Sequence, residues 1–235
     1  MNKKKGKKFW SFKALAEKTG ELTLYGEISD VTWWGDEITP KQFKEDLDAL
    51  GDIDTLNVYI NSPGGDVFAG QTIYSMLKRH KAYKNVYIDG VAASIASLVA
   101  MAGDKIIMPA NAMMMIHSPW TIALGNAQNF RKLADDLDKI RDSMVVAYES
   151  RSALTAEEVV EFMDAETWLS AKDCLEYGFA DEIEEVKQVA ACISEKYLAI
   201  YRNIPQELIK PPEGEGVKSS EIALRKKKLL LELEL

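Results

Sequence analysis

Three short segments place residues that could perform acyl-transfer chemistry directly after apolar stretches. Residues 61–65 read Asn-Ser-Pro-Gly-Gly, residues 90–97 read Gly-Val-Ala-Ala-Ser-Ile-Ala-Ser, and residues 114–119 read Met-Met-Ile-His-Ser-Pro. Ser94 is the candidate nucleophile, because it follows a predicted strand at the start of a helix of small residues, whose N-terminus favours negative charge. His117 is the candidate general base for the hydroxyl proton.

Each of these signals also has an ordinary structural interpretation. A glycine pair after a strand is usually a turn, a serine among small residues usually packs, and a lone histidine is usually structural. The other histidine, His80, lies between Arg79 and Lys81 and is typical of a solvated helix end. Three complementary elements, each at the end of a predicted strand, favour a catalytic interpretation of the set.

The elements around these segments alternate between the periods of strands and helices. Strands are expected at 21–25, 56–60, 86–88, 105–108 and 113–116, and helices at 39–50, 67–81 and from 94 onward. This alternation predicts an α/β domain with largely parallel strands.

The second half of the chain begins with a long amphipathic helix, expected from Asn126 to Ser150 because apolar residues recur there at helical spacing. Thr155 and Ser170 are predicted helix caps, and Gly178 is a predicted helix end. A short strand is expected at 179–183.

Composition excludes several classes of protein. The net charge of −8 argues against binding nucleic acid. The longest apolar run, 91–103, is too short to span a bilayer, and no apolar segment follows the basic start, so we expect a cytoplasmic protein that does not enter membranes. The two cysteines, Cys174 and Cys192, form no metal-binding pattern. We therefore expect no metal and no cofactor.

The order of the three segments resembles the peptidase subunit of the Clp protease family, and the resemblance extends from about residue 21 to 183. It implies an α/β fold of the ClpP/crotonase type, a superhelix of β-β-α units with a protruding handle helix. It also implies that Ser94 is the nucleophile and His117 the base, and that the backbone N–H groups of Gly65 and Ile95 form the oxyanion hole. The expected substrate is a polypeptide, and the expected assembly is a homo-oligomeric ring of seven subunits, stacked on a second ring.

The third member of the expected triad departs from the family, which has an aspartate shortly before a motif like Trp-Leu-Ser-Ala at 168–171. Alignment on that motif places Glu166 at this position, and Asp164 is the competitor. A glutamate can orient a histidine as an aspartate does. We prefer Glu166 and keep Asp164 as the alternative.

With this resemblance, three regions are expected. Residues 1–19 form a flexible basic arm, 20–187 the serine peptidase domain, and 188–235 a C-terminal extension that is partly helical or disordered and contains a Pro-Gly-rich linker at 211–216.

For the biological role, we prefer a phage-type maturation protease and keep a housekeeping peptidase as the alternative. Glu-Thr-Trp at 166–168 and Gly-Phe-Ala-Asp at 178–181 resemble the Clp-like proteases of phages and prophages, which trim capsid and scaffold proteins during head maturation. The alternative is a housekeeping peptidase that works with an ATP-driven (AAA+) unfoldase, which would be a separate protein because no Gly-x-x-x-x-Gly-Lys-Ser/Thr loop is present. A crotonase-like acyl-CoA enzyme, a lysine-dependent signal-peptide peptidase and a non-catalytic ring are weaker alternatives.

Overall fold

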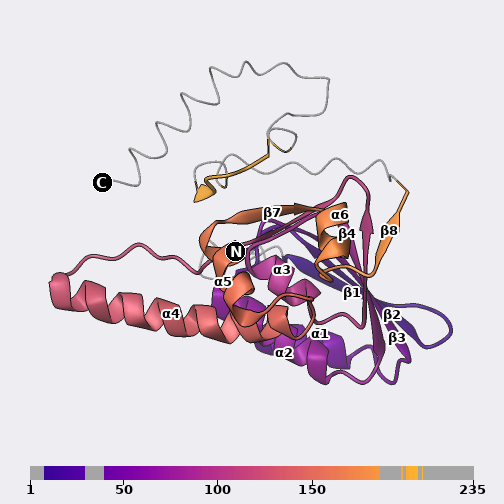
Figure 1. Ribbon diagram of the computed structural model, residues 1–235. Coiled ribbons are helices and arrows are strands. Elements are labelled where there is room, and N and C mark those ends of the chain that lie inside the picture. Colours follow the sequence, from indigo (N-terminus) through magenta and orange to yellow (C-terminus); the bar gives the residue numbers. More distant parts are fainter. Residues whose placement is uncertain (1–7, 30–39, 186–196, 198–199, 206–207, 209–235) are drawn as a thin grey trace, which may run out of the picture.

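The computed structural model describes residues 8–29, 40–185, 197, 200–205 and 208. Within this part of the chain, eight strands form one mixed sheet that carries helices on its faces (Figure 1). The strands are β1 (Trp10–Ala14), β2 (Thr19–Tyr25), β3 (Thr55–Ser62), β4 (Tyr83–Ala93), β5 (Lys105–Pro109), β6 (Met113–Ile116), β7 (Thr167–Ser170) and β8 (Glu182–Glu184). The helices are α1 (Pro40–Asp48), α2 (Val67–Arg79), α3 (Ile95–Ala100), α4 (Ala127–Glu149), α5 (Ala156–Asp164) and α6 (Ala171–Glu176).

The sheet is parallel in its centre, as the alternating pattern predicts. β2, β3, β4 and β5 pair in parallel, β8 adds to β5, and β6 pairs in parallel with the last residues of β4. The two antiparallel pairs are β1 with β2 and β6 with β7. The predicted α/β fold of the ClpP/crotonase type is therefore confirmed.

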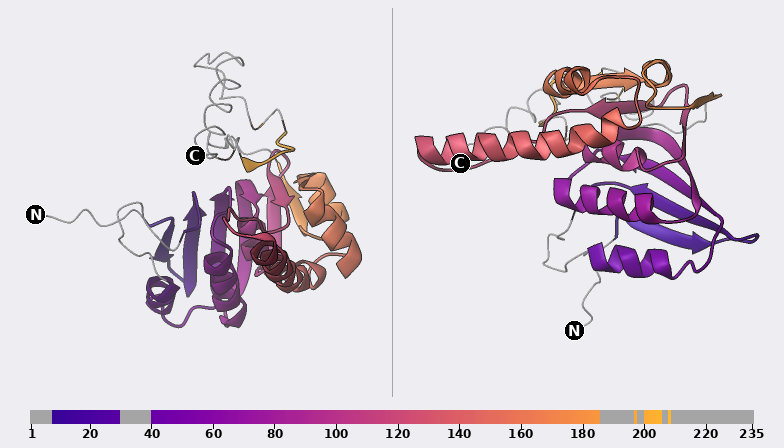
Figure 2. Two further views of the ribbon diagram at one scale, coloured as in Figure 1. Left: turned by 90° about the vertical axis from the view of Figure 1, so that its left-hand side faces the viewer. Right: turned by 60° about the horizontal axis from the view of Figure 1, so that its bottom comes forward.

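The helices α1 and α2 lie along one face of the sheet (Figure 2). β3 alternates strictly between partly exposed and buried residues, so its buried residues Leu56, Val58 and Ile60 face the core under these helices. On the opposite face, the rings of Tyr59 and Tyr87 stack at 5.0 Å between centroids.

β4 is longer than the sequence pattern suggested, because it continues through Gly90 instead of ending there. Its burial alternates up to Asp89 and is then continuous from Gly90 to Ala93. The register with β3 shifts between Ile60 and Ser62, where β4 leaves β5 and begins to pair with β6. The last residues of β4 are thus covered on both faces.

The N-terminal strand lies inside the stretch that the sequence assigned to a basic arm. Trp10 pairs with Leu24 across β1 and β2, and its ring packs edge-on against Phe43 of α1. Its indole N–H donates to Asp46 at 2.8 Å. These contacts explain why Trp10–Ala14 is ordered as a strand; residues 1–7 lie outside the described part.

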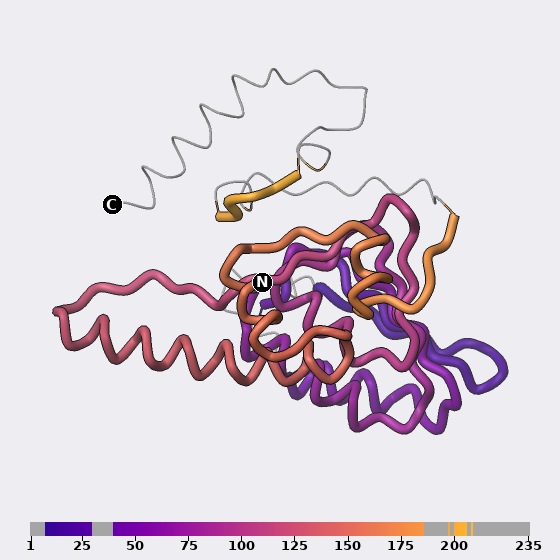
Figure 3. The backbone as a smooth tube through the Cα atoms, in the orientation of Figure 1, coloured from indigo at the N-terminus to yellow at the C-terminus, as the bar shows by residue number. Residues whose placement is uncertain are grey.

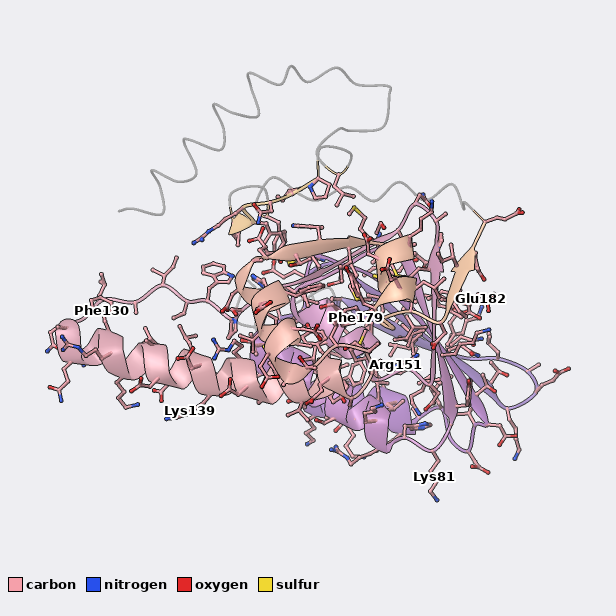
Figure 4. All side chains as sticks on the ribbon, viewed as in Figure 1. Lys81, Phe130, Lys139, Arg151, Phe179 and Glu182 are labelled. Carbon is pink, nitrogen blue, oxygen red and sulfur yellow. The ribbon has the colours of Figure 1, made fainter. Side chains whose placement is uncertain are left out.

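The long helix α4 matches the predicted handle and extends away from the body of the molecule (Figure 3). Asn126 caps it by accepting hydrogen bonds from the amides of Gln128 and Asn129. The segment between β6 and α4 runs out along the helix before the chain turns back, and in Figure 4 Phe130 and Lys139 lie on α4 outside the body whereas Phe179 lies within it.

The predicted caps at Thr155 and Ser170 are confirmed, since each forms a reciprocal capping box. Of the expected C-terminal extension, the structure describes Tyr197, residues 200–205 and Leu208, which we call the C-terminal strap. It lies near β7 (Figures 1 and 2). The linker predicted at 211–216 and the rest of the expected extension lie outside the described residues. None of the described helices is both long and apolar enough to cross a bilayer.

Candidate active site

The pairing of β4 with β6 brings the candidate nucleophile and base together. Ala93 is the register partner of Met115, so Ser94 and His117 both follow the ends of two adjacent parallel strands. The Ser94 amide continues this ladder by donating to the Met115 carbonyl at 2.9 Å. Backbone hydrogen bonds therefore fix the relative position of the two residues.

Ser94 lies at a sharp turn between β4 and α3. Its φ is 54° and its ψ is −131°, a region that non-glycine residues seldom occupy. Such a strained turn between a strand and a helix presents a serine hydroxyl at the edge of a sheet, as in other serine hydrolases. The surrounding sheet must supply the free energy that holds this conformation.

The side chains of Ser94 and His117 form a close pair. Ser94 Oγ lies 2.7 Å from His117 Nε2, and each residue is 8% exposed. Burial lowers the pKa of His117 to about 4, and the charge of nearby Glu166 opposes this shift. The imidazole is therefore neutral near pH 7 and, with its proton on Nδ1, can accept the proton of Ser94.

The loop after β3 packs directly against the nucleophile. Gly64 has a φ of +99°, and a Cβ on it would lie 2.6 Å from Ser94 Cβ. Gly65 has a φ of +146°, and a Cβ there would lie 1.9 Å from the Ile28 carbonyl oxygen. Only glycine permits this approach of the two backbones. The structure thus places the Gly65 segment beside Ser94, where the sequence expects an oxyanion hole.

Ile95 would supply the second oxyanion donor, and its side chain packs against α2. Gly70 of α2 is so close to it that a Cβ on Gly70 would lie 2.2 Å from Ile95 Cγ1. Ile95 itself is fully buried. The first residue of α3 therefore has little freedom to move relative to the sheet.

The register of β6 with β7 places Glu166 next to His117. Ile116 pairs with Thr167, so the next residues on the two antiparallel strands are His117 and Glu166. Glu166 has a φ of 50°, again unusual for a residue with a side chain. The carboxylate of Glu166 accepts hydrogen bonds from the backbone amides of Arg202 and Asn203, at 2.6 and 2.8 Å.

Asp164 faces a different environment. It accepts a hydrogen bond from Ser118 Oγ at 2.6 Å and lies 3.9 Å from the Arg141 guanidinium. Its side chain is 55% exposed. Of the two carboxylates considered for the third position, Glu166 is the one whose charge acts on His117.

The other serines near the site are engaged elsewhere. Ser97 is fully buried, and its hydroxyl contacts the Ser94 carbonyl at 2.5 Å and the Tyr148 hydroxyl at 2.8 Å. The hydroxyl of Ser118 is bound to Asp164. Ser94 is thus the serine that combines a neighbouring base with a strained turn.

Tyr201 of the strap is part of the site, and sequence reasoning did not identify it. Its hydroxyl donates to the Pro63 carbonyl and also contacts the Ser94 side chain. Its ring lies edge-on to His117, with 5.5 Å between centroids. Burial raises its pKa. A signal was available in the continuous apolar run at the end of β4, which indicates that some segment covers the second face of that strand.

Comparison with known proteins agrees with this geometry. Residues 35–187 match the family described as Clp protease. The ATP-dependent Clp protease proteolytic subunit of Deinococcus radiodurans is 32% identical over 140 residues, which is 58% of this chain and 68% of that protein. The subunits of the same name from Bacteroides fragilis and Porphyromonas gingivalis are each 31% identical, over 58% and 59% of this chain and 67% and 64% of theirs.

Proposed function

Since this chain belongs to the Clp protease family and is a serine-type peptidase, we propose that it cleaves polypeptides with Ser94 as nucleophile and His117 as general base. The observation that carries these assignments is the 2.7 Å contact between Ser94 Oγ and His117 Nε2 at the end of paired strands. The neutral imidazole is in the protonation state that a general base requires.

In the proposed reaction, Ser94 Oγ attacks the carbonyl carbon of the scissile bond while its proton passes to His117 Nε2. The carbonyl oxygen becomes an oxyanion, which the N–H groups of Gly65 and Ile95 stabilise. The tetrahedral intermediate then collapses, and His117 gives its proton to the leaving amine. A water molecule, deprotonated by His117, releases the acyl group and restores the Ser94 hydroxyl.

We further propose that the active form is a homo-oligomeric ring, stacked in two layers of seven subunits, that receives polypeptides from an ATP-driven unfoldase. The curated relatives are named as proteolytic subunits of an ATP-dependent protease. This sequence contains no nucleotide-binding loop of its own. We propose that this partner is a separate protein in the same compartment, and that the compartment is the cytoplasm.

A second candidate is the trimming of capsid and scaffold proteins during phage head maturation. The motifs Glu-Thr-Trp at 166–168 and Gly-Phe-Ala-Asp at 178–181 favour this role, because they resemble the Clp-like proteases of phages. Co-purification with an unfoldase would support the first role, and a capsid gene beside the gene for this chain would support the second.

The catalytic assignment is tested with a fluorophosphonate probe followed by peptide mapping. We expect labelling at Ser94, and Ser94→Ala should abolish it and reduce peptide turnover by about 10⁶-fold, as in related triads. Ser118→Ala is the matched control, because Ser118 is close to the site but bound to Asp164, and it should keep both properties. Labelling at Ser97 or Ser118 would overturn the assignment.

A further inference from the structure

The C-terminal strap packs on an apolar surface that adjoins Ser94. Tyr197, Tyr201 and Leu208 of the strap form one buried cluster with Val91, Ala93 and Met115. These body residues belong to the ends of β4 and β6, the two strands that position Ser94 and His117. The surface under the strap is therefore the approach to the candidate catalytic pair.

Tyr201 lies against the catalytic pair. Its hydroxyl donates to the Pro63 carbonyl close to the Ser94 side chain, its ring packs edge-on against His117, and only 3% of the residue is exposed. A reacting carbonyl carbon must come to about 3 Å from the serine oxygen. A phenol group that is bound to Pro63 and packed against His117 takes up space that such a carbonyl would need.

The proton of the Tyr201 hydroxyl is already used in this arrangement. A tyrosine hydroxyl has one proton, and that of Tyr201 is donated to the Pro63 carbonyl. Ser94 Oγ keeps its 2.7 Å contact with His117 Nε2. The strap therefore covers the catalytic pair without separating its two members.

The strap also engages the candidate third member of the triad. The amides of Arg202 and Asn203 both donate to Glu166 Oε1, and the Asn203 side chain donates to the Ala165 carbonyl at 2.9 Å. Hydrogen bonds to a carboxylate stabilise its charge and fix its direction. One short segment thus contacts the nucleophile, the base and the carboxylate.

We propose that the C-terminal strap is an autoinhibitory segment that occupies the substrate site, and that polypeptides offering apolar or aromatic side chains displace it. This inference rests on the proposed function. The nature of the displacing ligand follows from the covered surface, where the strap places the Tyr201 ring against both Trp168 and His117. A substrate segment must replace these contacts to open the site.

The experiment measures the second-order rate constant for fluorophosphonate labelling of Ser94 in the full chain. Tyr201→Ala should raise this constant about tenfold or more, because covalent labelling proceeds only from molecules whose site is open. Tyr201→Phe keeps the ring but loses both hydroxyl contacts, so it should give a smaller increase. Tyr83→Ala is the matched control: Tyr83 is 52% exposed and begins β4, whereas Ser94 follows its other end, so the rate should not change.

A second arm supplies the segment in trans. A synthetic peptide with the sequence of residues 197–208 should slow labelling of the Tyr201→Ala protein, and the same peptide with alanine in place of Tyr201 should not. Tyr201→Phe also keeps the test valid if Tyr201→Ala fails to fold.

The outcomes separate the two proposals. Equal labelling rates in wild type and in both Tyr201 variants, or no effect of the peptide, would overturn the autoinhibitory strap and leave the catalytic assignment intact. Absence of labelling at Ser94 in every variant would overturn the proposed function, and the strap with it.

Discussion

The two halves of the candidate active site are held by different parts of the chain. Ser94 and His117 are set by the pairing of β4 with β6 and are buried within the sheet. Glu166 directly precedes β7, beside His117, but its carboxylate is bound by amides of the C-terminal strap. One half is thus built by main-chain hydrogen bonds of the sheet, and the other half depends on a segment near the end of the chain.

The sheet therefore determines where Ser94 and His117 lie, whereas the strap acts on the charged group, the Glu166 carboxylate. The sheet can hold the serine and the imidazole at 2.7 Å without any contribution from the carboxylate. In the proposed triad, the role of the Glu166 carboxylate would be to fix the tautomer of the imidazole and to stabilise its positive charge. A site organised in this way can be fully formed and still be inactive while the strap is in place.

The largest effect that separates the halves should come from Glu166→Gln. We expect this change to reduce turnover of a short peptide by up to about 10⁴-fold, by analogy with the aspartate-to-asparagine change in a known triad. The glutamine oxygen can still accept from Arg202 and Asn203, so the strap should stay in place. Steady-state kinetics on the purified variant make the measurement.

Asp164→Asn is the matched comparison and should cost little, because asparagine can still accept the hydrogen bond from Ser118. The reverse ranking would transfer the role to Asp164. If both variants are nearly neutral, Ser94 and His117 act as a dyad. The half of the site that contains Glu166 would then have no catalytic role.

A smaller effect is expected in the half built by the sheet, from Gly65→Ala. A Cβ at this position would lie 1.9 Å from the Ile28 carbonyl, so the loop must shift and displace the proposed oxyanion donor. We expect a loss of about 10²–10³ in turnover, the range for one donor. Gly51→Ala is the control, since Gly51 also has a positive φ but open space around it. Near-normal activity of a folded Gly65→Ala protein would argue against this donor.

The smallest effect concerns acid stability. Burial lowers the pKa of His117 from the usual 6.5 to about 4, although Glu166 opposes the shift. Between these pH values the unfolded chain binds the proton and the folded chain does not, so acid favours unfolding. The free energy of unfolding should fall by up to about 3 kcal/mol as the pH is lowered from 6.5 to 4.

Denaturant titrations of wild type and His117→Gln test this, because carboxylates elsewhere contribute equally to both proteins. The variant should lack the His117 contribution, and Tyr201→Ala should reduce it by letting water reach the imidazole. An identical acid dependence in wild type and His117→Gln would contradict the burial of the base.

Much of the site could be predicted from the sequence, because helix caps, glycine turns and strand ends position its residues, and short sequence motifs indicate each of these. Several features of the site depend on residues that are close together in the sequence. They are the capped helices α4 and α5, the glycine pair at 64–65 and the helix start at Ser94. The end of β4 was placed too early, because a glycine in an apolar run usually indicates a turn. In the structure Gly90 continues the strand, where β4 changes partners from β5 to β6.

The role of Tyr201 could not be predicted in the same way. Its partners Pro63, Ser94 and His117 are far from it in sequence, and no local pattern reports a contact of that range. A tyrosine in a polar extension also has no motif of its own. The apolar residues Val91 and Ala93 were the sequence signal for a segment that covers the second face of β4, and they did not say which segment it is.

The position of the strap near the C-terminus also bears on how the protein is made. A ribosome delivers residues in order, at about 5–20 per second, and domains fold as they emerge. β4, β6 and β7 are synthesised before the strap, so on a chain that folds as it emerges these strands can pair and bring Ser94 to His117 before Tyr201 is added. During this interval a chaperone that shields the new apolar surface would have the task that the strap later performs.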